Sequence, residues 1–172
     1  QNLNFGVNAS KSVLLRSDSG NITLDRDITI NKGIGNNIVL QANGAGTSVI
    51  NNTGRTITLD TGATTSVGML SSGSGSLENK GTINIKEGNS QGIAILSSSS
   101  GTNTGTIAVT GNTSTGVYND GTFNMTGGSI TANNSGIGVY ATGATTNLTS
   151  GTLTVSNGSA AIYANNATVG LG

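Results

Sequence analysis

Short stretches of alternating apolar and polar residues recur along this chain at an almost constant interval. The string Thr-Ile-x-[Leu/Ile/Val], or a close variant of it, begins at Thr56 and returns at Thr82, Thr106, Ser129 and Thr152. The steps between these first residues are 26, 24, 23 and 23 residues. Self-similarity at a fixed period of this length is the sequence signature of a solenoid. The repeat therefore predicts the architecture before any single residue is considered.

Two further strings keep the same period. One joins a small residue to an apolar pair, at Gly68-Met69-Leu70, Gly92-Ile93-Ala94, Gly116-Val117-Tyr118, Gly138-Val139-Tyr140 and Ala161-Ile162-Tyr163. The other is fainter, at Ser76-Leu77, Thr102-Asn103-Thr104, Phe123-Asn124-Met125, Asn147-Leu148-Thr149 and Thr168-Val169. Each period thus holds three alternating stretches separated by Gly, Asn and Ser, which predicts three strands joined by turns. Apolar residues do not recur at the spacing i, i+3, i+4, so no substantial α-helix is expected.

Three strands in each repeat predict an all-β fold, a parallel β-helix of about seven coils. A propeller blade needs four strands, and a leucine-rich repeat needs Leu-x-x-Leu-x-Leu with an Asn at a fixed offset. In a parallel β-helix each strand pairs with its equivalent one coil away, and alternate residues point inward. We therefore expect one core stack of Ile57, Ile83, Ile107, Ile130 and Leu153, and a second of Leu59, Ile85, Val109, Ala132 and Val155.

The turns before the Thr-Ile strands share an Asn-x-Gly sequence. It occurs at Asn52-Thr53-Gly54, Asn79-Lys80-Gly81 and Asn103-Thr104-Gly105. Glycine adopts positive φ without a steric cost, and Asn tolerates the same region. We expect the equivalent Asn side chains to stack and to hydrogen-bond to one another along the rod.

The chain is expected to be a fragment of a longer solenoid. Residues 1–12 form an irregular start, and residues 13–172 form one β-helical domain. The chain begins with Gln1, without a start Met or a signal peptide, and it stops at Gly172 in the middle of a coil. Solenoids need polar caps at both ends, and we find none at the C-terminus.

Composition narrows the functional classes. The chain contains 28 glycines and no proline, cysteine, histidine or tryptophan, and 8% of its residues are charged with a formal net charge of zero. A neutral chain has no electrostatic attraction to nucleic acid or to an anionic membrane. The strict period of β-branched residues argues against disorder despite the low charge. No segment is as long and apolar as a membrane span.

The repeats resemble those of a known family. The run Asn79-x-Gly81-x-Ile83-x-Ile85-x-x-Gly88-x-Ser90-x-Gly92-Ile93 returns as Asn103-x-Gly105-x-Ile107-x-Val109-x-Gly111-x-x-Ser114-x-Gly116-Val117. This arrangement resembles the passenger repeats of type V autotransporters, and especially the large outer-membrane adhesins of fusobacteria. The likeness covers roughly residues 13–170, although Gly127-Gly128 and Ser150-Gly151 replace Asn-x-Gly in the later repeats.

This resemblance implies a right-handed β-helix at the cell surface that holds adhesive sites away from the outer membrane. The anchor would be a C-terminal barrel outside this chain. The implied roles are a stalk or scaffold and participation in adhesion to host cells or other bacteria, with a link to virulence. The partner would be a surface protein or a glycan, and we expect a monomer that binds no nucleic acid and no cofactor.

Catalysis is not expected. Without His and Cys the chain cannot build a Ser-His-Asp triad, a Cys nucleophile or a usual zinc site. Its densest acidic group is Asp18, Asp25 and Asp27, near Arg16 and Arg26, and it reads as a solvated turn. The alternative is a carbohydrate-active β-helix enzyme, either a polysaccharide lyase or a hydrolase.

The candidate contact site is a ladder of Tyr118, Tyr140 and Tyr163, with Leu70 and Leu96 at comparable positions two coils earlier. If the preceding residues point inward, the tyrosines point outward as a stripe, where aromatic rings with a hydroxyl suit sugars or proteins. The simpler alternative is that they only stack on one another and stabilise the solenoid. A more remote alternative is ice binding through the outward Thr-x-Thr array, which Asp27, Asn84 and Ala108 interrupt.

Overall fold

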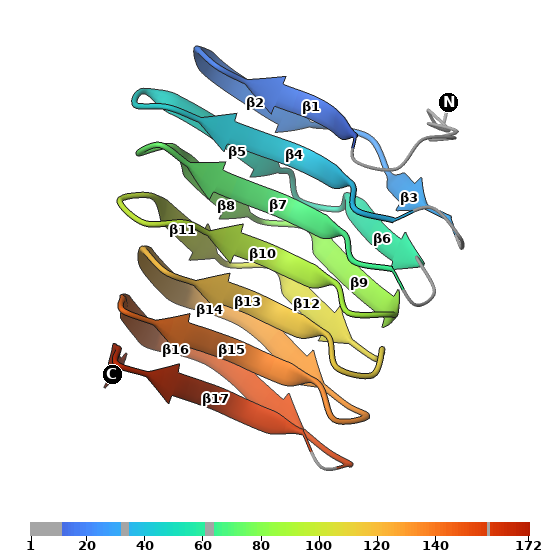
Figure 1. Ribbon diagram of the computed structural model, residues 1–172, viewed down its shortest axis with the longest axis vertical. Helices are drawn as coiled ribbons and strands as arrows, with labels where there is room; N and C mark the ends of the chain where they lie inside the picture. The colour runs from blue at the N-terminus through green and yellow to red at the C-terminus, as the bar shows by residue number, and fades with distance from the viewer. Residues whose placement is uncertain (1–11, 32–34, 61–63, 158) are drawn as a thin grey trace.

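The three alternating stretches of each repeat form strands, and each strand pairs in parallel with its equivalent in the next coil (Figure 1). This computed structural model describes residues 12–31, 35–60, 64–157 and 159–172. The described part contains strands and turns but no helix, so the predicted all-β parallel β-helix is confirmed. The predicted irregular start, residues 1–12, lies outside the described residues apart from Ser12.

Two parallel sheets form the walls of the solenoid. The front sheet, nearest the viewer in Figure 1, contains β1 (Val13–Ser17), β4 (Ile38–Asn43), β7 (Val67–Ser72), β10 (Gln91–Ile95), β13 (Thr115–Asn119), β15 (Ile137–Thr142) and β17 (Ala160–Asn165). The first limb of the back sheet contains β2 (Gly20–Leu24), β5 (Thr47–Asn51), β8 (Ser76–Asn79), β11 (Ser100–Asn103) and β18 (Thr168–Leu171). Its second limb contains β3 (Ile28–Ile30), β6 (Thr56–Asp60), β9 (Thr82–Glu87) and β12 (Thr106–Val109). Two longer strands, β14 (Thr122–Ala132) and β16 (Thr145–Val155), run through both limbs.

The solenoid is right-handed and has about six turns. In Figure 1 the front strands run from right to left, the chain returns behind them, and each coil lies below the previous one. Viewed along this advance, the chain turns clockwise. The three strand positions are filled in every coil through β16, and β17 and β18 fill the first two positions of one further coil. The number of turns is therefore slightly smaller than the repeats predict.

The predicted core stacks form in the second limb of the back sheet. The first stack pairs Ile57, Ile83, Ile107, Ile130 and Leu153 in that order. Its four isoleucines are at most 1% exposed. Burial of a side chain of this size stabilises a fold by roughly 1.5–3 kcal/mol relative to exposure. The second stack ends differently from the prediction, because Val155 is 40% exposed and no described strand pairs with this part of β16 on its far side.

A buried asparagine ladder also forms, but one of its members differs from the prediction. Asn51 Nδ2 donates to Asn79 Oδ1 at 2.8 Å, and Asn79 Nδ2 donates to Asn103 Oδ1 at 2.8 Å. All three side chains are fully buried. Asn52, the predicted member, instead donates to Asp25 Oδ1 at 2.6 Å near the surface. The ladder gives the buried amides of Asn79 and Asn103 both a donor and an acceptor, whereas Asn51 Oδ1, at its start, has no partner among the described residues.

Close contact between coils explains the Ser-x-Gly part of the repeat. Ser66 N donates to Ser90 Oγ at 3.1 Å, and Ser90 N donates to Ser114 Oγ at 3.3 Å, so each buried serine binds the backbone of the preceding coil. A Cβ on Gly92 would lie 2.7 Å from the carbonyl oxygen of Gly116. Real Cβ atoms do not approach an oxygen so closely, and only glycine fits at this position without a backbone shift.

Loss of the Asn-x-Gly turn merges strands in the later coils. Where Gly127-Gly128 and Ser150-Gly151 replace this turn, β14 and β16 continue from the first limb into the second. A register irregularity between Met125 and Ser129 absorbs the change of direction. In these coils one continuous strand therefore forms both limbs of the back sheet. Among the described residues, no helix is long and apolar enough to cross a membrane.

Candidate functional site: an aromatic stripe and its neighbouring groove

The three tyrosines of the chain form one stacked column on the front sheet. Tyr118 pairs with Tyr140, and Tyr140 pairs with Tyr163. The ring centroids of the first pair lie 5.6 Å apart with planes inclined by 10°, and those of the second pair lie 5.0 Å apart with an inclination of 16°. The neighbours Val117 and Asn119 are fully buried, so the tyrosine between them points outward as the alternation predicts.

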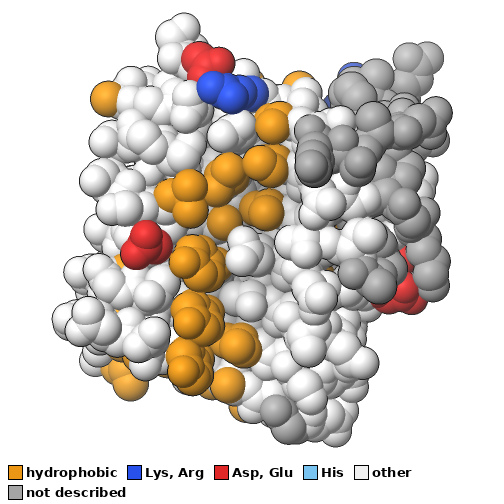
Figure 2. Space-filling view, viewed as in Figure 1, with side chains coloured by type: hydrophobic (Ala, Val, Ile, Leu, Met, Phe, Trp, Pro, Cys, Tyr) orange, Lys and Arg blue, Asp and Glu red, His pale blue; other side chains and the backbone are white. Residues whose placement is uncertain are grey.

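The column continues upward with apolar residues, of which Leu70 is a predicted member and Ala94 is not. Leu70 pairs with Ala94, and Ala94 pairs with Tyr118. Leu96 was expected in the stripe, yet it lies beyond the end of β10, and Ala94 takes its place. We call the set Leu70, Ala94, Tyr118, Tyr140 and Tyr163 the tyrosine stripe. Figure 2 shows hydrophobic side chains that run as a band down this face of the molecule.

The stacking decides which parts of the rings face a partner. Each face of the Tyr140 ring is turned toward another tyrosine, so a partner meets mainly ring edges and hydroxyl groups. Tyr163 is the most open of the three, with 49% of its surface exposed. The two readings of the ladder, mutual stacking and an outward stripe, are therefore compatible in one geometry. The stripe is rigid because each ring holds its neighbour, and such pairs contribute about 0.5–1.5 kcal/mol beyond burial.

Asp120 lies beside the stripe and acts on it electrostatically. Burial is the main reason that the pKa of Tyr118 is raised above its ordinary value of 10.0, and the Asp120 carboxylate raises the pKa further. Tyr140 adds a smaller contribution in the same direction. The Tyr118 hydroxyl therefore remains a hydrogen-bond donor throughout the neutral range.

The same carboxylate lines a groove between the front sheet and the back sheet. The groove has a volume of about 340 Å³. Turns of three successive coils line it, with residues Ser97–Ser100, Asp120–Thr122 and Gly143–Thr145. Gly143 has φ of +62°, and a Cβ there would lie 3.4 Å from Asp120 Oδ1. The sequence shows Asp120 as the last charged residue of the chain, but it does not show which turns surround it.

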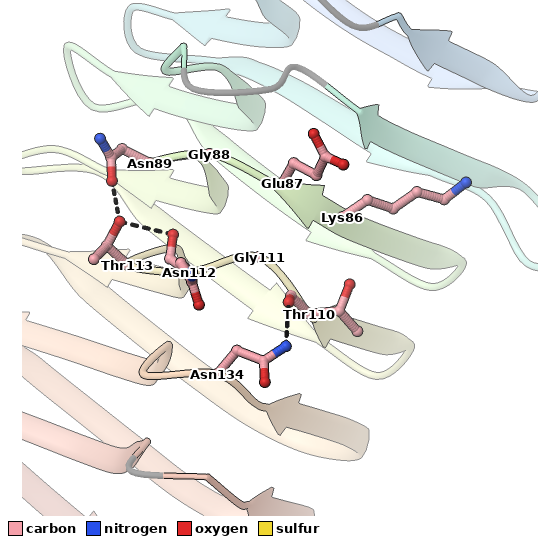
Figure 3. A pocket seen from close by; sticks show the side chains of 9 residues that line it. All are labelled: Lys86, Glu87, Gly88, Asn89, Thr110, Gly111, Asn112, Thr113 and Asn134. Carbon is pink, nitrogen blue, oxygen red and sulfur yellow. Dashed lines mark hydrogen bonds between the residues drawn. The ribbon is translucent and has the colours of Figure 1, made fainter.

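A second groove, of about 530 Å³, lies at the turns between the back sheet and the next front strand (Figure 3). Its polar groups largely satisfy one another. Thr113 Oγ1 donates to Asn89 Oδ1 and lies 2.7 Å from the Asn112 carbonyl oxygen, while Asn134 Nδ2 donates to the Thr110 carbonyl at 2.9 Å. Figure 3 shows the Lys86 side chain directed away from these amides. Several of the polar groups that line this groove are therefore already engaged in hydrogen bonds with one another.

The outward threonines of the back sheet are in register, as the sequence predicts. One column contains Thr56, Thr82, Thr106, Ser129 and Thr152, and the neighbouring column contains Thr29, Thr58, Asn84, Ala108, Thr131 and Thr154. The middle of the second column carries an amide and a methyl group, which interrupt the row of hydroxyls. The two columns are regular, but their side chains are uncharged hydroxyl, amide and methyl groups.

The acidic group near the N-terminus serves local structure. Arg16 Nε donates to both carboxylate oxygens of Asp18, at 2.9 and 3.0 Å. Hydrogen bonds from Arg16, and next from Asn43, lower the pKa of Asp18. Asp27 Oδ1 accepts from the backbone N–H of Thr56 at 2.9 Å and so holds the preceding coil to the next. Among the described residues, no group of three or more metal-ligating side chains comes together.

Comparison with known proteins found no relative of this chain. No protein-family model, no curated protein and no solved structure matches this chain. The resemblance to autotransporter passengers therefore rests on the repeats and on the β-helix that they form.

Proposed function

We propose that this chain is part of a bacterial surface adhesin, where it acts as a β-helical scaffold that presents the tyrosine stripe to a partner. The parent protein would be a type V autotransporter passenger, similar to the large fusobacterial outer-membrane adhesins. Its location would be the cell surface, and its partner would be a protein or glycan on a host cell or on another bacterium. We expect it to act as a monomer, without a cofactor.

The observation that carries this proposal is the position of all three tyrosines in one outward column of a rigid sheet. Tyrosine combines a large apolar surface with a hydroxyl group and loses little conformational entropy on binding, which favours its use in contact sites. Nothing in the core requires the column, because the core stacks lie on the other side of the sheet. Other β-formers at these positions would keep the strand pairing but not the stacked column of rings.

The construction of the solenoid supports the scaffold role. Each coil is bonded to the next through backbone ladders, the Asn51–Asn79–Asn103 ladder and the buried serines. Stability in such an array comes from nearest-neighbour contacts, so length is gained by adding coils. The proposed role is binding and not catalysis, since the chain lacks the His and Cys residues on which many hydrolytic sites depend.

The proposal is tested by the binding of the purified chain to host epithelial cells and to bacteria of several species, measured by flow cytometry. We expect binding that falls at least about tenfold in the variant Tyr118→Ala/Tyr140→Ala/Tyr163→Ala. The matched control is Thr58→Ala/Thr82→Ala/Thr106→Ala, three changes on the back sheet that leave the stripe intact. Circular dichroism and urea titration verify that both variants remain folded.

Two outcomes would overturn the adhesin role of this segment. One is equal binding by the tyrosine variant and the control variant. The other is the absence of binding to every cell type tested. Release of new reducing or unsaturated ends from polysaccharides incubated with the chain would instead favour the carbohydrate-active enzyme.

A further inference from the structure

We propose that the Asp120 groove and the adjoining tyrosines form a binding site for an uncharged, hexose-based oligosaccharide. This inference rests on the proposed function, because it names the ligand class of the same surface. The site consists of the Tyr118 and Tyr140 hydroxyls, the Asp120 carboxylate and the serine and threonine side chains of the groove.

The groups of the site are contiguous. Asp120 is the common member, since it follows Tyr118 by two residues, directly after β13, and also lines the groove. Tyr118 stacks on Tyr140, which extends the site along the stripe. The site therefore extends over three successive coils. It places the tyrosine ring edges, the Asp120 carboxylate and the hydroxyls of the groove next to one another.

The hydrogen-bonding capacity of Asp120 is available to a ligand. Within the part of the chain that the structure describes, the Asp120 carboxylate makes no side-chain hydrogen bond and no ion pair. An ionised carboxylate accepts hydrogen bonds through two oxygens and donates none. Adjacent hydroxyls of a hexose are two donors at matching separation. Bonds to a charged acceptor are stronger than neutral ones, so Asp120 is the main polar anchor.

The charge of the surroundings selects an uncharged ligand. Asp120 is the only charged side chain after residue 87, and the residues that line the groove carry no cation. A sialylated or sulfated sugar would bring an anion next to this carboxylate with nothing to compensate it. Like charges brought together at a binding surface cost affinity. A neutral hexose meets no such penalty.

The shape favours a glycan over a protein. Polar residues border the tyrosine stripe on the side of the groove, because Asp120 follows Tyr118 by two residues and Thr142 follows Tyr140 by two residues. Stable protein partners bury about 800 Å² on each side, with an apolar centre. A linear oligosaccharide needs only a narrow track that alternates apolar edges with hydrogen-bonding groups. The turns on either side of Asp120 supply these groups as serine and threonine hydroxyls.

The test uses a glycan array that carries each oligosaccharide core in neutral, sialylated and sulfated forms, followed by calorimetry with the strongest neutral core. We expect binding to neutral cores and at least about tenfold weaker binding to their anionic forms. Asp120→Asn keeps the shape and removes the charge, and we expect it to weaken the neutral core about tenfold, as the loss of a charged hydrogen bond does. It should also reduce the discrimination against the anionic forms. Tyr140→Phe keeps the stack, removes one hydroxyl and should cost about threefold.

The matched control is Glu87→Gln, which removes a carboxylate from the second groove and should leave binding unchanged. Ser97→Trp, at an exposed position, fills the Asp120 groove without touching the core and should abolish binding in a protein that remains folded. Preference for anionic forms, equal effects of Asp120→Asn and Glu87→Gln, or no binding to any neutral core would overturn the inference.

Failure of this inference can be told apart from failure of the proposed function. If cells bind through the tyrosines while neutral glycans neither bind nor compete, the adhesin proposal stands and the partner is a protein. If neutral glycans bind and cells do not, the site is real and the adhesin proposal fails.

Discussion

Asn79 donates its side-chain amide to Asn103 Oδ1 at 2.8 Å, and both side chains are fully buried. Asn51 donates to Asn79 in the same way, so the three residues form a continuous ladder through three coils. The last amide of the ladder ends on the Gly105 carbonyl oxygen at 3.0 Å. A buried polar column of this kind fixes the register between coils, since a slipped coil would leave its amides without partners.

Removal of the Asn79 side chain, the middle member of the ladder, should strongly destabilise the protein. In Asn79→Ala the Asn103 Oδ1 loses its donor, and Asn51 Nδ2 retains only a 3.3 Å bond to the Thr82 carbonyl oxygen. An unsatisfied buried polar group costs about 1–3 kcal/mol, so we expect unfolding to become easier by about 2–5 kcal/mol. The measurement is the urea midpoint at constant slope. Asn52→Ala is the control and should cost less than 1 kcal/mol, and a similar loss in both variants would refute the ladder as a stabilising element.

The close approach of Gly92 to Gly116 offers a second test of the contact between coils. A Cβ on Gly92 would also lie 3.2 Å from methyl groups of Ile107 and Ile85, in addition to the backbone clash with the next coil. We expect Gly92→Ala to cost about 2–4 kcal/mol, at the upper end of overpacking effects. Gly54 has φ of +75° and open space around it, so Gly54→Asn is the control. Asn tolerates this conformation, and thermal denaturation should show a loss below 1 kcal/mol. Equal losses would mean that the coils can separate to admit a side chain.

Much of the core could be predicted from sequence because strand alternation leaves little choice. Once Ile57 and Ile83 are aligned by the repeat, the side chains two residues further along must also point inward, and the structure confirms this through Ile130 and Ala132. The prediction holds less well at Val155, because burial there depends on a neighbouring coil and not on the strand itself.

Turns of unequal length explain why the sequence predicts Asn52, and not Asn51, as a member of the ladder. Four residues separate Asn51 from Thr56, whereas two separate Asn79 from Thr82, so alignment on the Asn-x-Gly motif selects Asn52 in place of Asn51. The error at Leu96 has another cause: this residue has the same outward phase as Ala94 but lies two residues beyond it, so it does not share the strand position of Leu70 and Tyr118.

The candidate site also has one part that could be predicted from the sequence and one part that could not. The tyrosine column was predictable, because residues at equivalent positions of a strand must stack in a parallel β-helix. The groove beside it was not, since three turns of different sequence build it, and the position of Asp120 depends on their backbone conformations. Gly143, with its positive φ, is one such determinant that a periodic pattern does not reveal.

The ionisation of Tyr118 gives a prediction about alkaline pH. Its raised pKa means that the folded protein keeps a proton which the unfolded chain releases near pH 10.0. The stability that this group contributes is therefore fully present below pH 10.0 and is lost as the pH rises through the raised pKa. In a Tyr140→Phe/Tyr163→Phe background, tyrosinate absorbance should titrate above the ordinary tyrosine value. Asp120→Asn should lower this pKa only in part, because burial is the larger cause. An ordinary titration in the folded background would contradict the partly buried placement.

Phe123 is the largest fully buried side chain of the described core, and its position makes the last prediction specific. It pairs with Gly101 in the preceding coil and with Thr146 in the next, so the ring lies in the interior beside two smaller residues. Phe123→Ala would leave a cavity that these neighbours are too small to fill, and such cavities cost about 3–5 kcal/mol. Phe123→Leu keeps much of the volume and should cost about 1 kcal/mol, which separates loss of packing from loss of the aromatic ring. Urea denaturation of both variants provides the measurement. If Phe123→Ala costs no more than Phe123→Leu, the first limb of the back sheet is less tightly packed than the second, and the solenoid relies on its isoleucine stacks alone.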